Sequence, residues 1–161
     1  KSTFVEAFGL MLTAQGLRVG LITDVHVSAT VPDEDVRTAV RLLAAAKPAL
    51  VALGGDYVTN LDTTRAVPAA DMLAPPAQAP LGALAVLGNH DDDRIVPAAL
   101  VSRGFTVLKD ARTRLTIRGE TVDVAGLRYW TRRVSDIARV LNGAGPTTIL
   151  LAHDPRRLKR T

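Results

Sequence analysis

Short apolar runs alternate with amphipathic stretches along this chain, and that alternation predicts its secondary structure. The runs are rich in aliphatic residues and stop at glycine or at a polar residue, as buried strands do. They predict strands over residues 3–12, 17–23, 49–53, 81–87, 106–108 and 147–152. Apolar residues at helical spacing between the runs predict helices. These helices extend from Asp33 to before Lys47, over 63–73 with an interruption at Pro68, from Pro97 to Gly104, and over 134–141.

Two of the predicted helices have an apolar stripe. The first opens at Pro32, with Asp33 as the expected N-cap and acidic residues in the first turn. It ends at Lys47-Pro48, because the residue before a proline is disfavoured in the helical conformation. The two stripes consist of Val36, Val40, Leu43 and Ala44, and of Val134, Ile137, Ala138 and Leu141.

One segment has a different pattern. Residues 112–118 and 121–125 alternate between apolar and polar positions around Gly119-Glu120, which predicts a β-hairpin. We expect the aromatic pair Tyr129-Trp130, which follows it, to pack at the core or rim rather than to line a pocket. Elsewhere, strands and helices alternate in a way that implies βαβ crossovers and a largely parallel sheet. Without a repeat or a long linker, we predict an α/β fold with residues 1–161 as a single domain.

Length and composition are those of one soluble globular domain. The chain has 161 residues, of which 47% are hydrophobic and 22% are charged. This is enough apolar content for a sizeable core, and it argues against disorder. The chain contains no cysteine. Disulfide bonds, thiolate zinc sites and cysteine nucleophiles are therefore excluded.

The chain is basic, with a formal net charge of +4 at pH 7 and much of its arginine from Arg128 onward. A basic surface attracts phosphate-bearing substrates, anionic lipid and nucleic acid alike. Aromatic residues make up only 4% of the chain, and no pattern of arginine and aromatic residues suggests a base-stacking platform. We therefore do not expect nucleic acid as a specific partner.

The sequence leaves the localisation open. No apolar run approaches the roughly 20 residues that span a bilayer. The first residue is Lys1 rather than methionine, so a leader or anchor could have been removed. The cytoplasm, a peripheral membrane position and an extracytoplasmic one all fit.

Polar residues able to bind metal follow four of the predicted strands. The carboxyl ends of parallel strands lie along one edge of a sheet, so we expect these residues to meet in one crevice. Asp24 and His26 are two positions apart, so an extended backbone would point both to the same side. Carboxylate, amide and imidazole donors together suit manganese, iron or zinc. The four blocks are Asp24 with His26, Gly54-Gly55-Asp56, Gly88-Asn89-His90-Asp91, and His153-Asp154.

Each block alone is typical of an ordinary turn, but their order along the chain is not. L-I-T-D-V-H, G-G-D-Y-V, A-V-L-G-N-H-D and L-L-A-H-D-P together resemble the signature of the calcineurin-like metallophosphoesterases. They are most similar to the bacterial single-domain branch of that family, over about residue 3 to the C-terminus. The resemblance implies a layered sheet with flanking helices and the hydrolysis of phosphate mono- or diesters.

The resemblance also implies a metal centre. Two divalent metal ions, of manganese, iron or zinc, would be bridged by Asp56. Asp24 and His26 would hold the first ion, and Asn89 and His153 the second. A metal-bound hydroxide would be the nucleophile, with both cations neutralising the developing charge.

In the third block, His90 would act on the substrate and Asp91 would support His90. By the same resemblance, His90 is catalytic and is not a metal ligand. It would contact the phosphoryl group or the leaving oxygen of the phosphoester. Asp91 would orient the imidazole of His90.

The sequence departs from the family after His153. The family's pattern continues with a strand carrying G-H-x-H, whose two histidines complete the metal sites, and this sequence stops at Thr161 before it. We therefore expect a C-terminally incomplete domain. Either this sequence stops short of the biological chain, which is the interpretation we favour, or the domain lacks its last strands and its activity is impaired. Two alternatives stay open. One is a catalytically impaired remnant of the same fold that acts as a binding module, and the other is an interaction module that forms oligomers through an exposed sheet edge.

Overall fold

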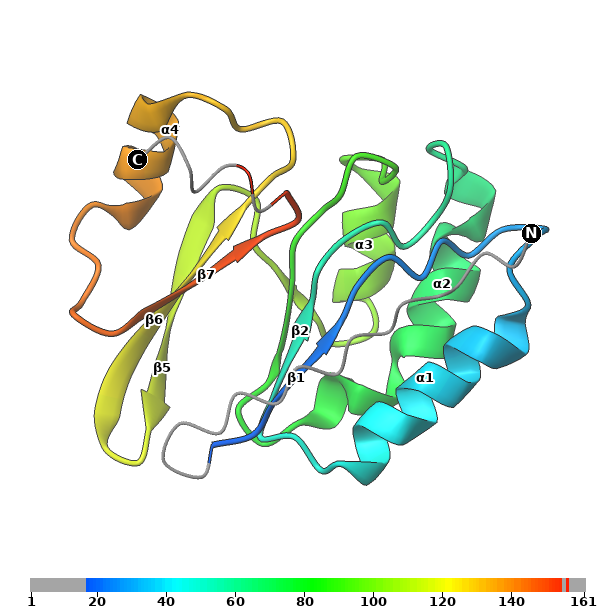
Figure 1. Ribbon diagram of the computed structural model, residues 1–161, viewed down its shortest axis with the longest axis horizontal. Coiled ribbons are helices and arrows are strands. Elements are labelled where there is room, and N and C mark those ends of the chain that lie inside the picture. Colours follow the sequence, from blue (N-terminus) through cyan, green and yellow to red (C-terminus); the bar gives the residue numbers. More distant parts are fainter. Residues whose placement is uncertain (1–16, 155, 157–161) are drawn as a thin grey trace.

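The computed structural model describes residues 17–154 and 156, and in this part of the chain the strands form two sheets (Figure 1). The first sheet is parallel, in the order β1–β2–β3–β4, and the second has the order β5–β6–β7. The strand expected over residues 3–12 lies outside the described residues. The elements are β1 (Val19–Ile22), α1 (Asp33–Ala45), β2 (Leu50–Leu53), a 3-10 turn (Thr63–Arg65), α2 (Ala66–Leu73), a second 3-10 turn (Pro75–Gln78), β3 (Ala83–Ala85), α3 (Ile95–Val101), β4 (Thr106–Val107), β5 (Ala111–Ile117), β6 (Glu120–Leu127), α4 (Val134–Leu141) and β7 (Thr148–Ala152).

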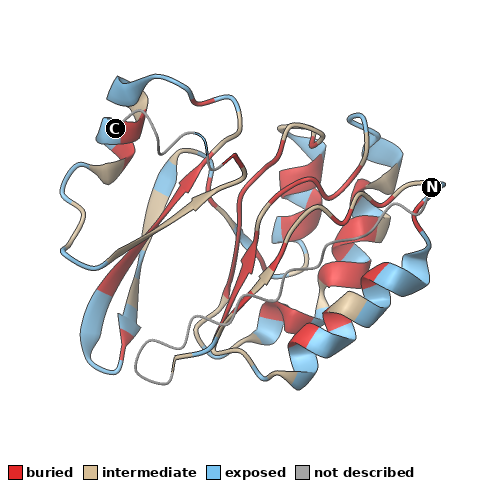
Figure 2. Ribbon diagram, in the orientation of Figure 1, coloured by how far each residue is buried: buried red, intermediate tan, exposed pale blue. Residues whose placement is uncertain are grey.

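The parallel sheet lies between three helices and the second sheet (Figure 1). Val51 and Leu53 of β2 belong to the core shared with α1, α2 and α3. Leu50, on the other face of β2, packs in a second cluster with Val124 of β6. Helix α4 covers the outer face of the second sheet through Ile137. Figure 2 shows the buried residues along the sheets and on the inward sides of the helices. The predicted layered α/β fold with flanking helices is confirmed.

The second sheet corrects the prediction of a single, largely parallel one. Strands β5 and β6 form the expected hairpin, and β7 pairs with β6 in parallel rather than joining the first sheet. Both faces of β7 are partly covered, because Ile149 packs toward the first sheet and Leu150 toward α4. An apolar run predicts a strand buried on two faces but does not show which other strand it pairs with. The strand was therefore predicted correctly and its place was not.

The two sheets approach each other closely at Gly126 of β6. A Cβ atom at this position would lie 2.3 Å from the Cβ of Leu108 and 2.9 Å from a methyl carbon of Val86. Real Cβ atoms do not approach so closely, because protein interiors are packed at van der Waals distance. A glycine is therefore needed here for the second sheet to sit against the first.

The hairpin turn lies one residue earlier than predicted. Arg118 and Gly119 form the two-residue loop, with φ angles of 54° and 84°, and Ile117 pairs with Glu120. Two consecutive left-handed residues match the twist of the flanking strands, which is why such loops favour them. Glu120, expected in the turn, is instead the first residue of β6.

Helix α1 begins one position earlier than predicted. Pro32 occupies the N-cap position, and Asp33 is the first helical residue, so the predicted cap is wrong. Asp33 still contributes to the acidic first turn, where a negative charge is favourable next to the helix N-terminus. Three residues of the predicted stripe are buried, but Ala44 is exposed.

The other helices are short and differ from prediction in detail. Pro68 lies in the first turn of α2, where a missing N–H disrupts little, and it does not interrupt the helix. In α4, Ile137 is buried as predicted, but Val134 and Ala138 are exposed and Val140 is buried in their place. Two residues three positions apart suffice to cover one side of so short a helix. Among the described residues, no helix combines the length and hydropathy required to cross a bilayer.

Candidate metal centre

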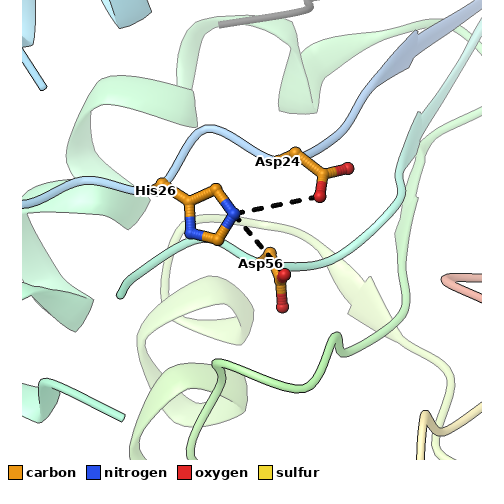
Figure 3. Close-up of side chains that lie close together, drawn as sticks. All are labelled: Asp24, His26 and Asp56. Carbon is orange, nitrogen blue, oxygen red and sulfur yellow. Dashed lines mark ion pairs between the residues drawn. The ribbon is translucent and has the colours of Figure 1, made fainter. Parts of the chain in front are cut away.

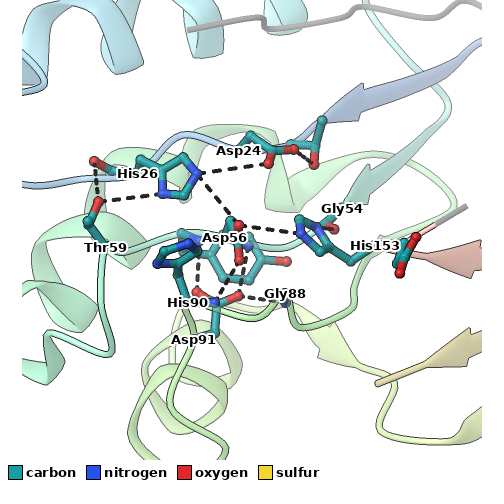
Figure 4. A network of polar contacts seen from close by, with 12 residues as sticks. Asp24, His26, Gly54, Asp56, Thr59, Gly88, His90, Asp91 and His153 are labelled. Atoms are coloured by element: carbon teal, nitrogen blue, oxygen red, sulfur yellow. Dashed lines mark hydrogen bonds and ion pairs between the residues drawn. The ribbon is translucent and has the colours of Figure 1, made fainter. Parts of the chain in front are cut away.

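Five residues predicted for the site lie close together where four loops converge: Asp24, His26, Asp56, His90 and His153 (Figure 4). Asp24 and His26 follow β1, Asp56 follows β2, and His90 follows β3, so these three loops leave one edge of the parallel sheet. His153 reaches the same place from the end of β7, in the second sheet. The predicted site therefore lies where loops of two sheets meet rather than along the edge of one sheet.

Asp24, His26 and Asp56 form a compact group of potential ligands (Figure 3). One atom from each lies within 4.8 Å of the other two. The His26 Nε2 is 3.9 Å from an Asp24 carboxylate oxygen and 3.5 Å from Asp56 Oδ2. These separations exceed hydrogen-bond lengths and suit donors placed around one cation at about 2.0–2.2 Å each. The group can therefore hold a metal ion.

All three residues of this group have a left-handed backbone. Their φ angles are 57° for Asp24, 45° for His26 and 56° for Asp56. The side chains of Asp24 and His26 do meet, but not through the predicted extended backbone. Residues other than glycine adopt this conformation only where the surroundings hold it. Here the N–H groups of Asp24 and His26 donate to the carbonyl oxygens of Gly55 and Asp56, at 3.0 Å each, so the first two loops fix one another.

Asp56 is the buried centre of the site, with 3% of its surface exposed. Its Oδ2 lies 3.5 Å from His26 Nε2 and 3.3 Å from His153 Nε2. Its Oδ1 accepts a hydrogen bond of 2.9 Å from the backbone N–H of His90. Burial alone would raise the pKa of Asp56, but the hydrogen bonds from His153 and His90 and the charges of His153 and His26 outweigh it and lower that pKa. The carboxylate is therefore ionised at neutral pH.

His153 is oriented by a backbone carbonyl. Its Nδ1 lies 2.9 Å from the carbonyl oxygen of Gly54. Because a carbonyl oxygen only accepts, Nδ1 carries the proton and Nε2 faces Asp56. The hydrogen bond with Asp56 raises the pKa of His153 to about 9, against the opposing effect of its burial.

His90 stands beside this group. Its ring centroid is 5.0 Å from that of His26, and the two rings are nearly perpendicular, at 82°. The backbone N–H of Asn60 donates to His90 Nδ1 at 3.0 Å. Nδ1 is thus the acceptor, and the neutral ring has its proton on Nε2. An N–H donor at this position can contact an oxygen of a bound phosphoryl group.

Asp91 has a different role from the predicted one. It is 1% exposed, and its Oδ2 accepts hydrogen bonds from the N–H groups of Asp56 (2.8 Å) and Gly88 (2.9 Å), while Oδ1 accepts one from Tyr57 (2.8 Å). The Nδ1 of the His90 ring already accepts a backbone hydrogen bond. Burial raises the pKa of Asp91, against the effect of the three N–H donors. Asp91 therefore joins the loop after β2 to the loop after β3.

Two glycines allow these loops to approach. A Cβ atom on Gly88 would lie 2.1 Å from Asp56 Oδ1, and one on Gly55 would lie 2.5 Å from the nitrogen of Gly88. Gly55 also has a φ of 101°, which side chains disfavour. Gly88 is thus required by the position of Asp56, and Gly55 by the close approach of Gly88.

Asn89 and His153 line the same pocket. The pocket has a volume of about 270 Å³ and is also lined by Tyr129, Asp154 and Arg156. Tyr129 is half-buried and lines this pocket, which agrees with the rim packing expected of it, and its neighbour Trp130 is 49% exposed. Tyr129 follows the hairpin, and no local pattern links that segment to the metal-binding blocks.

Sequence reasoning also missed Thr59. Its hydroxyl oxygen lies 3.4 Å from His26 Nδ1 and 3.4 Å from the His26 carbonyl oxygen. Thr59 is three residues after Asp56, in the same loop. Its position shortly after that block was the available signal, because the loop that brings Asp56 to His26 brings the next polar residues as well.

One known family has these sequence blocks. The family described as calcineurin-like phosphoesterase matches residues 17–159. The chain belongs to the calcineurin-like phosphoesterase family. The resemblance inferred from the four blocks is confirmed, and so is the bacterial nature of the relatives it suggested.

Two bacterial proteins are similar to this calcineurin-like phosphoesterase. It is 27% identical over 153 residues to the uncharacterized metallophosphoesterase YkuE of Bacillus subtilis. The matched region covers 91% of this chain and 54% of YkuE. It is 30% identical over 120 residues to the phosphodiesterase YaeI of Escherichia coli, which covers 70% of this chain and 44% of YaeI. The chain thus spans about half the length of both relatives. A protein of unknown function from Aquifex aeolicus has a TM-score of 0.40 and 14% identity, over 77% of this chain and 69% of that one.

Proposed function

We propose that this protein hydrolyses phosphate mono- or diesters with a centre of two divalent metal ions, of manganese, iron or zinc type. Membership of the calcineurin-like phosphoesterase family supports phosphoester hydrolysis as the activity. One observation carries the two-ion centre. Asp56 Oδ2 lies between two imidazole nitrogens, at 3.5 Å from His26 and 3.3 Å from His153, as a carboxylate that bridges two sites would.

The residues present fit such ions chemically. Carboxylate, imidazole and amide oxygen donors suit borderline first-row metals. His153 also has the second contact that is typical of a ligating histidine, because its Nδ1–H donates to the Gly54 carbonyl while Nε2 faces the site. In this proposal Asp24, His26 and Asp56 hold the first ion, and Asp56, Asn89 and His153 hold the second.

The metal ions would supply charge neutralisation and a water of lowered pKa as the nucleophile. The chain's own residues prepare the site for this. The low pKa of Asp56 keeps a negative charge between the two positions at neutral pH. Asp91 holds the loops of Asp56 and Gly88 together through backbone N–H groups, so the donors are placed before a substrate arrives.

His90 would act on the substrate. The backbone N–H of Asn60 donates to Nδ1, so the proton of the neutral ring is on Nε2. This Nε2–H can donate away from the Asn60 loop. From its place beside His26, this donor would bond a phosphoryl oxygen or the leaving oxygen. A positioned donor or general acid of this kind contributes about 100-fold or more to the rate.

The test is hydrolysis of p-nitrophenyl phosphate and of bis(p-nitrophenyl) phosphate with added manganese. Asp56→Asn and His90→Ala should each lower kcat/KM by at least about 100-fold. Asp71→Asn is the matched control, because it makes the same chemical change on the surface, where Asp71 pairs with Arg103. Unchanged turnover in both site variants would exclude the mechanism.

Manganese binding separates the proposal from its alternative. Titration of the wild-type protein with manganese, followed by calorimetry, should show binding that Asp56→Asn weakens. A folded protein that binds manganese in this way but turns over neither ester would instead be an impaired remnant with a binding role.

A further inference from the structure

We propose that the pocket beside His153 is a subsite for an aromatic group on the alcohol portion of the phosphoester, with Tyr129 as its specificity-determining wall. The inference rests on the proposed function, because it places the phosphate at the metal centre. It names a substrate class, phosphoesters that carry an aromatic ring, which family membership does not specify.

The pocket is continuous with the proposed position of the second ion. Asn89 and His153 line it, and both are the residues assigned to that ion. In this proposal, one ester group of a phosphate held between the two ions is directed at this pocket. The pocket volume of about 270 Å³ is ample for one ring, since a cavity of about 150 Å³ holds benzene in another protein.

Tyr129 is held in place by three neighbours. Its ring lies edge-on to Trp130, with centroids 5.0 Å apart, and 6.0 Å from the His153 ring. The guanidinium of Arg132 lies 5.7 Å from the Tyr129 ring centroid. A ring fixed in this way loses little freedom when it contacts a ligand, which favours binding. Aromatic pairs also prefer edge-on and offset arrangements like the ones that Tyr129 already makes.

The charges around the pocket do not oppose an ester of phosphate. Asp154 contributes a carboxylate, but Arg156 pairs with it at 2.8 Å and 3.0 Å, through Nε and a terminal nitrogen. Arg132 adds a further positive charge next to Tyr129. The pocket therefore combines an aromatic wall with a compensated carboxylate, and an uncharged aromatic group is the ligand that this chemistry recognises.

The experiment measures binding of three phosphonates to the manganese-loaded protein by calorimetry. Methylphosphonate, cyclohexylphosphonate and phenylphosphonate share the phosphoryl end, and the last two share a ring of similar size. We expect phenylphosphonate to bind about threefold to tenfold more tightly than both others. Equal affinity for phenyl- and cyclohexylphosphonate would overturn the aromatic subsite and leave only a hydrophobic pocket.

Variants of Tyr129 locate the preference. Tyr129→Leu should abolish the preference for phenylphosphonate, whereas Tyr129→Phe should keep it, because only the ring is needed. A preference that survives in Tyr129→Leu would place the aromatic contact elsewhere and overturn the assignment. The phosphonates cannot be hydrolysed, so these results do not depend on turnover. Hydrolysis of p-nitrophenyl phosphate without any phenyl preference would refute the subsite alone, and manganese-dependent phenyl preference without hydrolysis would refute the proposed activity alone.

Discussion

The loops of the parallel sheet and the segments of the second sheet contribute to one site by different means. The loops after β1, β2 and β3 are fixed by buried backbone hydrogen bonds, left-handed residues and close glycine contacts. The second sheet contributes His153 and Tyr129 from the ends of its strands, next to solvent-accessible ion pairs of Arg128 with Asp110 and of Arg156 with Asp154. The difference indicates that the candidate ligands of the first region are held by their own backbone contacts, whereas the position of His153 depends on how the second sheet packs against the first.

The largest expected effect comes from Asp91 in the first region. In Asp91→Asn, the amide NH2 would face backbone N–H groups that the carboxylate now satisfies. Leaving a buried donor unsatisfied costs about 1–3 kcal/mol, so we expect the free energy of unfolding to fall by about 3 kcal/mol. Urea denaturation followed by circular dichroism measures this change. A loss no greater than that of the surface control Asp71→Asn would show that Asp91 does not hold the loops.

Gly88→Ala should have a smaller effect on stability and a clear one on metal binding. The new Cβ would meet Asp56 Oδ1 at 2.1 Å, so the carboxylate or the loop must move, and such overpacking costs about 1–3 kcal/mol. Manganese affinity should fall as Asp56 is displaced. The control is Gly82→Ala, where nothing lies within 4 Å and the φ of 89° alone is unfavourable. If both variants bound manganese like the wild type, the close contact at Gly88 would not govern the site.

The smallest effect is expected in the second region, at Asp110. Its carboxylate accepts hydrogen bonds from Arg128 Nε at 2.7 Å and from the Thr131 hydroxyl at 2.6 Å. Burial alone would raise the pKa of Asp110, but these hydrogen bonds and the charge of Arg128 outweigh it and lower the pKa. A lowered pKa in the folded state stabilises the protein above the unfolded pKa of about 3.9, and this stabilisation is lost as the pH falls through the folded value.

Comparison of the wild type with Asp110→Asn therefore tests whether Asp110 stabilises the protein above its pKa and loses this effect at acidic pH. The wild type should be more stable by about 1 kcal/mol at pH 7, and the difference should shrink once the pH falls below about 4. Denaturation curves of both proteins from pH 3 to pH 7 measure it. A difference that stays constant across this range would mean that ionisation of Asp110 contributes nothing.

Much of the fold followed from short-range patterns. The apolar runs before Asp24, Asp56 and Asn89 predicted β1, β2 and β3, because a strand buried on both faces is apolar throughout. The helix between Asp33 and Lys47 followed from its spacing in the same way. The position of β7 beside β6 did not, because its apolar residues would have been buried equally well in either sheet.

In the candidate site too, local patterns predicted some features and not others. The sequence by itself determined which residues stand at the strand ends, and hence that Asp24, His26, Asp56 and His153 could meet, because those blocks are local. Only the tertiary structure decided that Asp91 binds the backbone of a loop 35 residues earlier, and that Tyr129 stands beside His153. The residues next to a carboxylate or an aromatic ring in the sequence do not show which distant group it will contact. Its partner is set by which loops the packing of the two sheets brings into contact.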